Sequence, residues 1–105
     1  MAKKNIAVLI DWYLPGNKAC GPVKSVYSLL EFLKDEFNFF VITTNCDLGS
    51  KVPYKNIKSN VWTKCNNIPV YYISKEKLKP KNILEVINGI SPDIIYLNSF
   101  WSYNF

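Results

Sequence analysis

Residue types that could do chemistry gather in one loop, Pro15 to Pro22, which leads into a predicted helix. The free N–H groups and the dipole of a helix N-terminus attract anions, so a phosphate could bind there. Gly21 allows the backbone to approach a ligand closely. Lys18, Lys24 and Ser25 could add positive charge or a hydroxyl group. The loop therefore predicts a phosphate-binding turn, although a plain loop-to-helix cap would use the same residues.

The same loop contains Cys20, beside the positive end of the predicted helix, a position that can lower the pKa of a thiol. No base or second thiol lies near it in the sequence, so we do not expect a catalytic cysteine. The chain has no histidine, which excludes Ser–His and Cys–His nucleophiles and nearly all catalytic zinc sites. It also has no Cys-x-x-Cys pair and no P-loop. We expect neither a catalytic residue nor a metal site in this chain.

The loop must be positioned by strands and helices whose patterns are visible in the sequence. Apolar or β-branched runs predict four strands, at 5–11, 39–44, 70–74 and 93–98. Helically spaced apolar residues, each time after a proline suited to a first helical position, predict helices from Pro22 to 33 and from Pro80 to 90. Segment 45–69 is polar and too long for an ordinary connection, and we expect a short strand near Val61-Trp62 within it.

Strand–helix–strand units in series predict an α/β fold, a Rossmann-like doubly wound parallel sheet in the strand order 3-2-1-4. In such sheets ligands bind outside the carboxyl ends of the strands where the order reverses. The ends of the first and fourth strands, Asp11 and Asn98, should therefore flank a cleft. Asp11 could contact an acceptor hydroxyl there, although an acid at a strand end more often satisfies nearby loop amides.

The sequence ends in an aromatic cluster, 99–105, without the polar fringe usual at a terminus. We therefore expect residues 1–105 to be a single partial domain, truncated after about four strands, whose second domain is absent. Further chain, or a second copy in a homo-oligomer, would cover the edge of the fourth strand and the terminal aromatics. Four aromatic residues could form a sugar-stacking wall at the cleft or pack against that remainder: Trp12, Tyr13, Phe100 and Trp101.

The formal net charge of +5 comes entirely from lysines, which are scattered along the chain. Without arginine, specific recognition of nucleic acid is not expected. The lysines suit a solvated surface, and a loosely basic face is also compatible with peripheral contact to an anionic membrane. The longest apolar runs, about six residues, are far shorter than the ~20 that cross a bilayer, and no signal peptide is recognisable. We expect a cytoplasmic protein, at most bound at the inner face of the membrane.

Five stretches of the sequence, in their order along the chain, match the pattern of a known family. They are Ile6 to Ile10, Tyr13-Leu14-Pro15, Gly21-Pro22-Val23-Lys24-Ser25-Val26, Phe40-Val41-Ile42-Thr43-Thr44 and Ser91-Pro92-Asp93-Ile94-Ile95-Tyr96-Leu97-Asn98-Ser99. This order, which covers most of the chain, resembles the N-terminal domain of GT-B glycosyltransferases of the family-4 type, in the glycosyltransferase group 1 superfamily.

The resemblance implies a retaining transfer of sugar from a nucleotide donor between two Rossmann-like domains, of which this would be the acceptor-side one. It implies no cofactor besides the nucleotide sugar as co-substrate, and a sugar or lipid-linked acceptor in polysaccharide or glycolipid synthesis. Gly21 would lie in the glycine-rich turn at the donor diphosphate, with Cys20 where the family usually has a second glycine. The paired glutamates that hold the nucleotide belong to the second domain, so we expect no turnover from residues 1–105 alone.

One position departs from the family pattern. Asn98 stands where many members carry a histidine that contacts the donor sugar. An asparagine amide can hydrogen-bond a hydroxyl group but cannot carry a proton at neutral pH. The resemblance therefore implies a sugar contact at Asn98 and leaves the sugar identity and the rate open.

Two other functions compete with sugar transfer. One is a non-catalytic α/β binding or assembly module that docks a separate catalytic chain through its exposed strand edge and terminal aromatics. The other is a nucleotide-cofactor oxidoreductase domain, which the missing Gly-x-Gly-x-x-Gly fingerprint disfavours.

Overall fold

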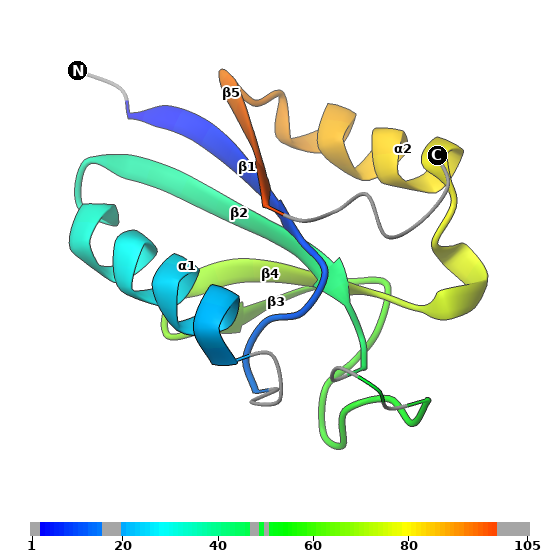
Figure 1. The fold of residues 1–105 in the computed structure, drawn as a ribbon. Helices are drawn as coiled ribbons and strands as arrows, with labels where there is room; N and C mark the ends of the chain where they lie inside the picture. The colour runs from blue at the N-terminus through cyan, green and yellow to red at the C-terminus, as the bar shows by residue number, and fades with distance from the viewer. Residues whose placement is uncertain (1–2, 16–19, 47–48, 50, 99–105) are drawn as a thin grey trace.

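The computed structural model describes residues 3–15, 20–46, 49 and 51–98, and of residues 20–22 the backbone alone (Figure 1). One five-stranded sheet runs in the order β3-β4-β2-β1-β5. The strands are β1 (Lys4–Ile10), β2 (Phe37–Thr44), β3 (Trp62–Cys65), β4 (Ile68–Ile73) and β5 (Ile94–Asn98). All neighbours are parallel except β3 and β4, which are antiparallel. The predicted α/β class and the strand order 3-2-1-4 are confirmed, since the four predicted strands appear as β4-β2-β1-β5.

Two helices cover opposite faces of this sheet (Figure 1). They are α1 (Cys20–Leu33), between β1 and β2, and α2 (Pro80–Ile90), between β4 and β5, with a short 3₁₀ turn, η1 (Lys75–Lys77), ahead of α2. α2 begins at the predicted proline and ends where Ser91 adopts a left-handed conformation, with φ of 52°. The helix of the first strand–helix–strand unit therefore lies on one face of the sheet, and the helix of the second unit lies on the opposite face.

The prediction that α1 begins at Pro22 is wrong, because the helix begins at Cys20. The first N–H groups of a helix have no acceptor within it, so a proline fits at any position of the first turn and does not mark the first residue. Gly21 therefore belongs to the first turn itself and is not the cap that precedes it.

The core consists of two apolar layers, one on each face of the sheet. On the α1 face, Val26 and Leu30 pack over alternate residues of β1, β2 and β4, and on the α2 face, Ile83, Ile87 and Ile90 do the same. The sheet residues in the first layer are Ile6, Val8, Ile10, Phe39, Val41, Ile68, Val70 and Tyr72, and those in the second are Ala7, Leu9, Ile42 and Ile73. Successive residues of a strand point to opposite faces, so β1 contributes to both layers.

The polar segment after β2 ends in a hairpin. β3 and β4 are joined by Asn66 and Asn67, both with positive φ (52° and 68°), the conformation that a tight two-residue turn requires. The short strand expected near Val61-Trp62 is confirmed at Trp62–Cys65, and the strand expected to begin at Val70 begins two residues earlier, at Ile68. The Asn-Asn pair was the local signal for this turn, since asparagine tolerates positive φ better than most residues.

β5 forms one edge of the sheet and pairs only with β1 among the described strands. Three of its apolar side chains remain exposed, Ile94 at 46 %, Ile95 at 49 % and Leu97 at 58 %. An apolar edge strand with this exposure is a surface on which another strand or domain could pack.

The layered core predicts unequal effects of two substitutions in α1. Leu30 is fully buried against the sheet, whereas Phe32 is 84 % exposed. We expect Leu30→Ala to lower the free energy of unfolding by about 2–5 kcal/mol, because it removes buried methyl groups and leaves a cavity. Phe32→Ala, the matched control on the same helix, should change it by less than about 0.5 kcal/mol. Urea denaturation followed by circular dichroism measures both, and equal losses would contradict the described orientation of α1.

Candidate functional site

The candidate site lies at the carboxyl edge of the sheet, where the strand order reverses on either side of β1. Ile10, the last residue of β1, is in register with Asn98, the last residue of β5. α1 begins at the same edge, because it follows β1 through a short loop (Figure 1). The prediction that the first and fourth strands are neighbours is confirmed, and the next element after β1, α1, begins at the same edge of the sheet.

One buried hydroxyl group links the end of β2 to the residue that follows β1. Thr44 Oγ1 donates a hydrogen bond to the backbone carbonyl oxygen of Asp11 at 2.7 Å. Asp11 is only 1 % exposed, so its side chain does not face solvent at this edge. That burial favours the structural interpretation of Asp11 over contact with an acceptor hydroxyl.

A second set of polar residues binds the segment after β2 to the end of β4. Asn45 Nδ2 donates to Ser59 Oγ at 3.0 Å, and Asn60 Nδ2 donates to Ser74 Oγ at 3.1 Å. The backbone N–H of Ser74 in turn donates to Asn60 Oδ1 at 3.0 Å. Sequence reasoning missed this network, although Asn45 and Ser74 each follow a buried strand directly and therefore had to reach the same edge.

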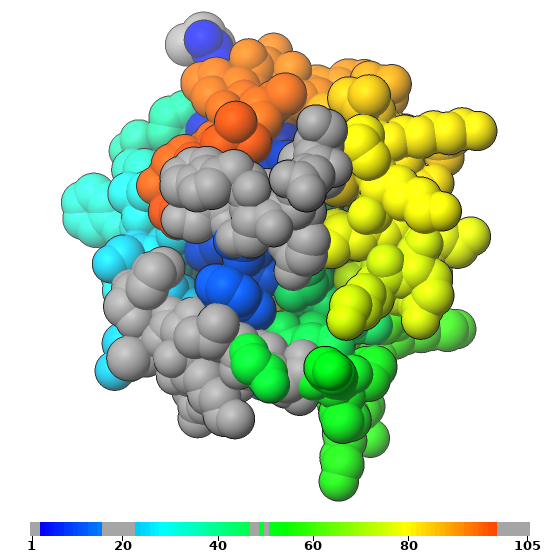
Figure 2. All heavy atoms as spheres, turned by 45° about the vertical axis from the view of Figure 1, so that its right-hand side comes forward, coloured from blue at the N-terminus to red at the C-terminus, as the bar shows by residue number. Residues whose placement is uncertain are grey.

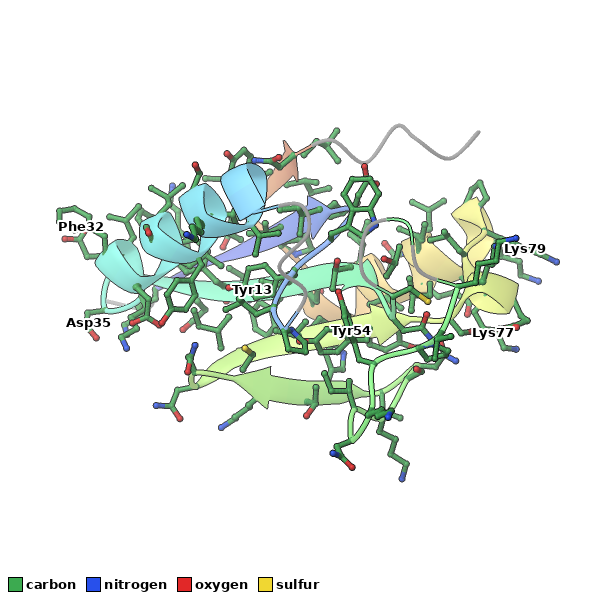
Figure 3. All side chains as sticks on the ribbon, turned by 60° about the horizontal axis from the view of Figure 1, so that its bottom comes forward. Tyr13, Phe32, Asp35, Tyr54, Lys77 and Lys79 are labelled. Carbon is green, nitrogen blue, oxygen red and sulfur yellow. The ribbon has the colours of Figure 1, made fainter. Side chains whose placement is uncertain are left out.

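Two tyrosine hydroxyl groups hold the loop that follows β1, which contains the buried Tyr13. Tyr72 OH donates to the carbonyl oxygen of Leu14, and Tyr54 OH donates to that of Tyr13 at 3.2 Å (Figure 3). Burial, with smaller contributions from neighbouring titratable groups, raises the pKa of both Tyr13 and Tyr72. These phenols are therefore neutral near pH 7, and the loop is anchored to the α1 face of the sheet up to Leu14.

The predicted site residues fall into three groups. Cys20 and Gly21 lie in the first turn of α1, and Lys24 and Ser25 follow in the same helix with exposed side chains. Asn98 and Trp12 are half-buried at the strand ends, and Asn98 Nδ2 donates to Tyr96 OH at 3.2 Å. Lys18 and Trp101 lie outside the described residues.

The two cysteines with described side chains do not have the chemistry of nucleophiles. Burial raises the pKa of the Cys46 thiol and of the Cys65 thiol, and a raised pKa favours the protonated, unreactive form. Within the ranges that the structure describes, no three His, Cys, Asp or Glu side chains cluster as they would around a metal ion.

Positive charge is concentrated on one flank of the carboxyl edge. The segment from η1 to the first turn of α2, yellow in Figure 2, carries four exposed lysines: Lys75, Lys77, Lys79 and Lys81. Glu76 is the one acidic residue among them.

Among the described residues, no helix is both long and apolar enough to cross a membrane.

Comparison with known proteins gives no match to a protein-family model, a curated protein or a solved structure. Function has to be inferred from the geometry of the chain itself.

The threonines at the end of β2 provide a matched pair for testing how this edge is held. Thr43 and Thr44 are both buried, but Thr43 Oγ1 has no hydrogen-bond partner among the described residues. We expect Thr44→Val to lower the free energy of unfolding by about 1–2 kcal/mol, because it leaves the Asp11 carbonyl oxygen without its donor. Thr43→Val should leave stability unchanged or raise it, because it removes only an unpaired buried hydroxyl group. Thermal denaturation would contradict this account if the order of the two variants were reversed.

Proposed function

We propose that this chain is the acceptor-side α/β domain of a nucleotide-sugar-dependent glycosyltransferase with a Rossmann-like GT-B architecture. The observation that supports it most is that the carboxyl ends of β1 and β5 are neighbours at the edge of the sheet where α1 also begins. In open parallel sheets this is where ligands bind. The resemblance of the sequence to family-4-type enzymes supplies the reaction class.

The diphosphate of the donor would bind at the first turn of α1. Cys20 and Gly21 are the first two residues of this helix, so their backbone N–H groups have no acceptor within it. The helix dipole adds positive potential at the same place. Lys24 and Ser25, both exposed in the second turn of the helix, can contribute a charge and a hydroxyl donor. Together these groups suit a negatively charged ligand.

We do not assign proton transfer to this domain. The chain lacks histidine, and the side chain of Asp11 is buried. Asn98 presents an amide, which can donate or accept a hydrogen bond but cannot act as a base. The domain would therefore hold the acceptor, a sugar or a lipid-linked sugar, and stabilise charge on the diphosphate. A second domain would supply the groups that bind the nucleotide.

Binding of the donor diphosphate can be tested by titrating the ¹⁵N-labelled chain with UDP-glucose, GDP-mannose, UDP and inorganic phosphate. We expect a diphosphate ligand to shift the backbone amide signals of Cys20, Gly21 and Val23, with weak affinity in the absence of a second domain. Lys24→Gln should lower that affinity by roughly two- to fivefold, the range for a single exposed charge.

Lys81→Gln is the matched control, since Lys81 is an exposed lysine in the first turn of the other helix. The affinity of the Lys81→Gln variant for the diphosphate should equal that of the unchanged chain. Shifts at the start of α2 in place of α1, or no saturable shifts with any of the four ligands, would reject the proposed diphosphate site.

Catalysis provides a separate test of the same function. We expect no hydrolysis or transfer from nucleotide sugars by residues 1–105 alone, because the nucleotide-binding groups would come from a second domain. Fusion or co-expression with a donor-binding domain encoded beside it should produce transfer, measured as nucleoside diphosphate release. Release by residues 1–105 alone at the same rate as by the combined protein would contradict the division of roles.

A second candidate function, a non-catalytic module that docks a separate chain, is favoured by the exposed side chains of β5. In that case Leu97→Lys, which places a charge on this edge, should abolish complex formation without lowering stability. Light scattering on the chain with and without its candidate partner measures this complex: no increase in mass on mixing argues against docking through β5.

A further inference from the structure

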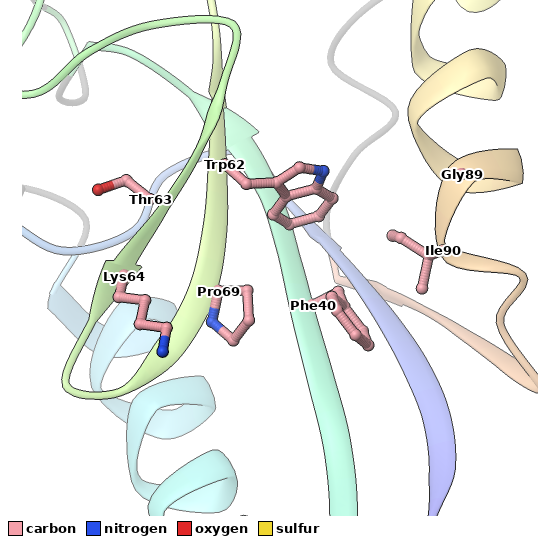
Figure 4. Close-up of a pocket in the computed structure, with 7 residues that line it drawn as sticks. All are labelled: Phe40, Trp62, Thr63, Lys64, Pro69, Gly89 and Ile90. Atoms are coloured by element: carbon pink, nitrogen blue, oxygen red, sulfur yellow. The ribbon is translucent and has the colours of Figure 1, made fainter.

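A pocket on the α2 face of the sheet has no part in the proposed sugar-transfer site. Its volume is about 370 Å³, and its lining residues are Phe40, Trp62, Thr63, Lys64, Pro69, Gly89 and Ile90 (Figure 4). Pro69 lies near the start of β4, and Gly89 and Ile90 end α2, so the pocket is at the amino end of β4, away from the carboxyl edge. A volume in this range is typical of small-molecule sites.

The pocket exists because α2 covers only part of its face of the sheet. Its buried residues pack over β1, β2 and the end of β4, and the β3–β4 hairpin extends beyond them. In the last turn of α2, Gly89 has no side chain, and a Cβ built there would meet nothing within 4 Å. An open space therefore remains between the end of α2 and the hairpin.

Aromatic rings form the wall of this space. Trp62, 40 % exposed, extends from β3 towards α2 (Figure 4). Its ring lies 5.7 Å from that of Phe40 and 5.3 Å from that of Tyr71, both in edge-to-face arrangements. These neighbours fix the orientation of the indole, so the wall is formed before any ligand binds. A flat apolar ring is the ligand surface that such a wall fits.

Two hydrogen-bond donors accompany the rings. The indole N–H of Trp62 has no acceptor among the described residues, and Lys64 makes no salt bridge among them. Alternate residues of a strand share a face, so Lys64 is on the same side of β3 as Trp62, about 7 Å further along. No acidic side chain lines the pocket. The polar part of a ligand should therefore be an acceptor that carries negative charge.

We propose that this pocket binds a planar aromatic anion, with its ring against Trp62 and Phe40 and its carboxylate, sulfonate or phosphate group at Lys64. The apolar wall and the Lys64 ammonium group select for both parts of such a ligand. A neutral aromatic molecule would gain only the contact with the rings, and a simple anion only the contact with the lysine. The site is independent of the proposed diphosphate site, because it shares no residue with it.

The test uses two fluorescent probes of similar shape, the anion 8-anilino-1-naphthalenesulfonate and the neutral N-phenyl-1-naphthylamine. We expect the anion to bind the intact chain at one saturable site, and Lys64→Gln to weaken that binding by about fivefold. Lys64→Gln should leave the affinity for the neutral probe unchanged. Equal affinity of the Lys64→Gln variant and the unchanged chain for the anion would overturn the assignment of an anionic ligand.

Gly89→Leu tests the location of the site without removing any existing contact. A leucine there would occupy the pocket, and we expect a loss in affinity for both probes of roughly tenfold or more. Replacing glycine within a helix also favours the helix, so the variant should remain folded, which its melting temperature verifies. Asn88→Leu, an exposed neighbour on the same helix outside the lining, is the matched control and should bind as the unchanged chain does.

Each of the remaining outcomes would contradict the proposed small-molecule site in this pocket. Full probe binding by folded Gly89→Leu would assign the dye to another apolar surface, such as the edge of β5. Equal weakening by Asn88→Leu would show a general effect of the helix. Dimerisation that is abolished by Gly89→Leu would assign the pocket to contact with a second copy instead of a small molecule.

Discussion

The structure depends above all on the burial of β1. Ala7 and Val8 have no exposed surface, and the strand lies between β2 and β5 with an apolar layer on each face. Because water does not reach such a strand, its backbone polar groups have to be paired by the neighbouring strands. The two apolar faces of β1 also determine where α1 and α2 can pack. The position of the carboxyl edge, and of the candidate site on it, follows from this one strand.

The polar residues that follow the buried strands stabilise that edge and are not free for chemistry. Thr44 donates to the backbone of the loop after β1, and Asn45, Asn60 and Ser74 bond to one another or to Ser59. Their hydrogen-bonding capacity is used within the fold. What remains available for a ligand is the first turn of α1, with an exposed lysine and serine in the turn that follows. Such groups bind and orient an anion, which suits an acceptor-side domain better than a complete active site.

The two faces of the sheet differ in how completely they are covered. On the α1 face, the apolar layer reaches β4 and continues into Tyr54 and Ile57 of the segment after β2. On the α2 face, the hairpin projects past the helix and leaves Trp62 beside Phe40 at the surface. The described part of the connection from β2 to β4 contains no helix, so no helix of the described chain other than α2 packs on this face of the sheet. The aromatic pocket is a consequence of that asymmetry.

The sequence by itself determined the order of the elements, because hydrophobic periodicity is a local property. The spacing of Ile83, Ile87 and Ile90 and the apolar run of β1 predicted a helix and a buried strand, and the parallel order of four strands followed from known connection rules. Only the tertiary structure decided the rest. α1 begins before Pro22, since a proline is tolerated anywhere in a first turn, and the burial of Asp11 appears only once the fold is formed. Trp62 and Gly89 line one pocket because packing brings together positions that no local pattern connects.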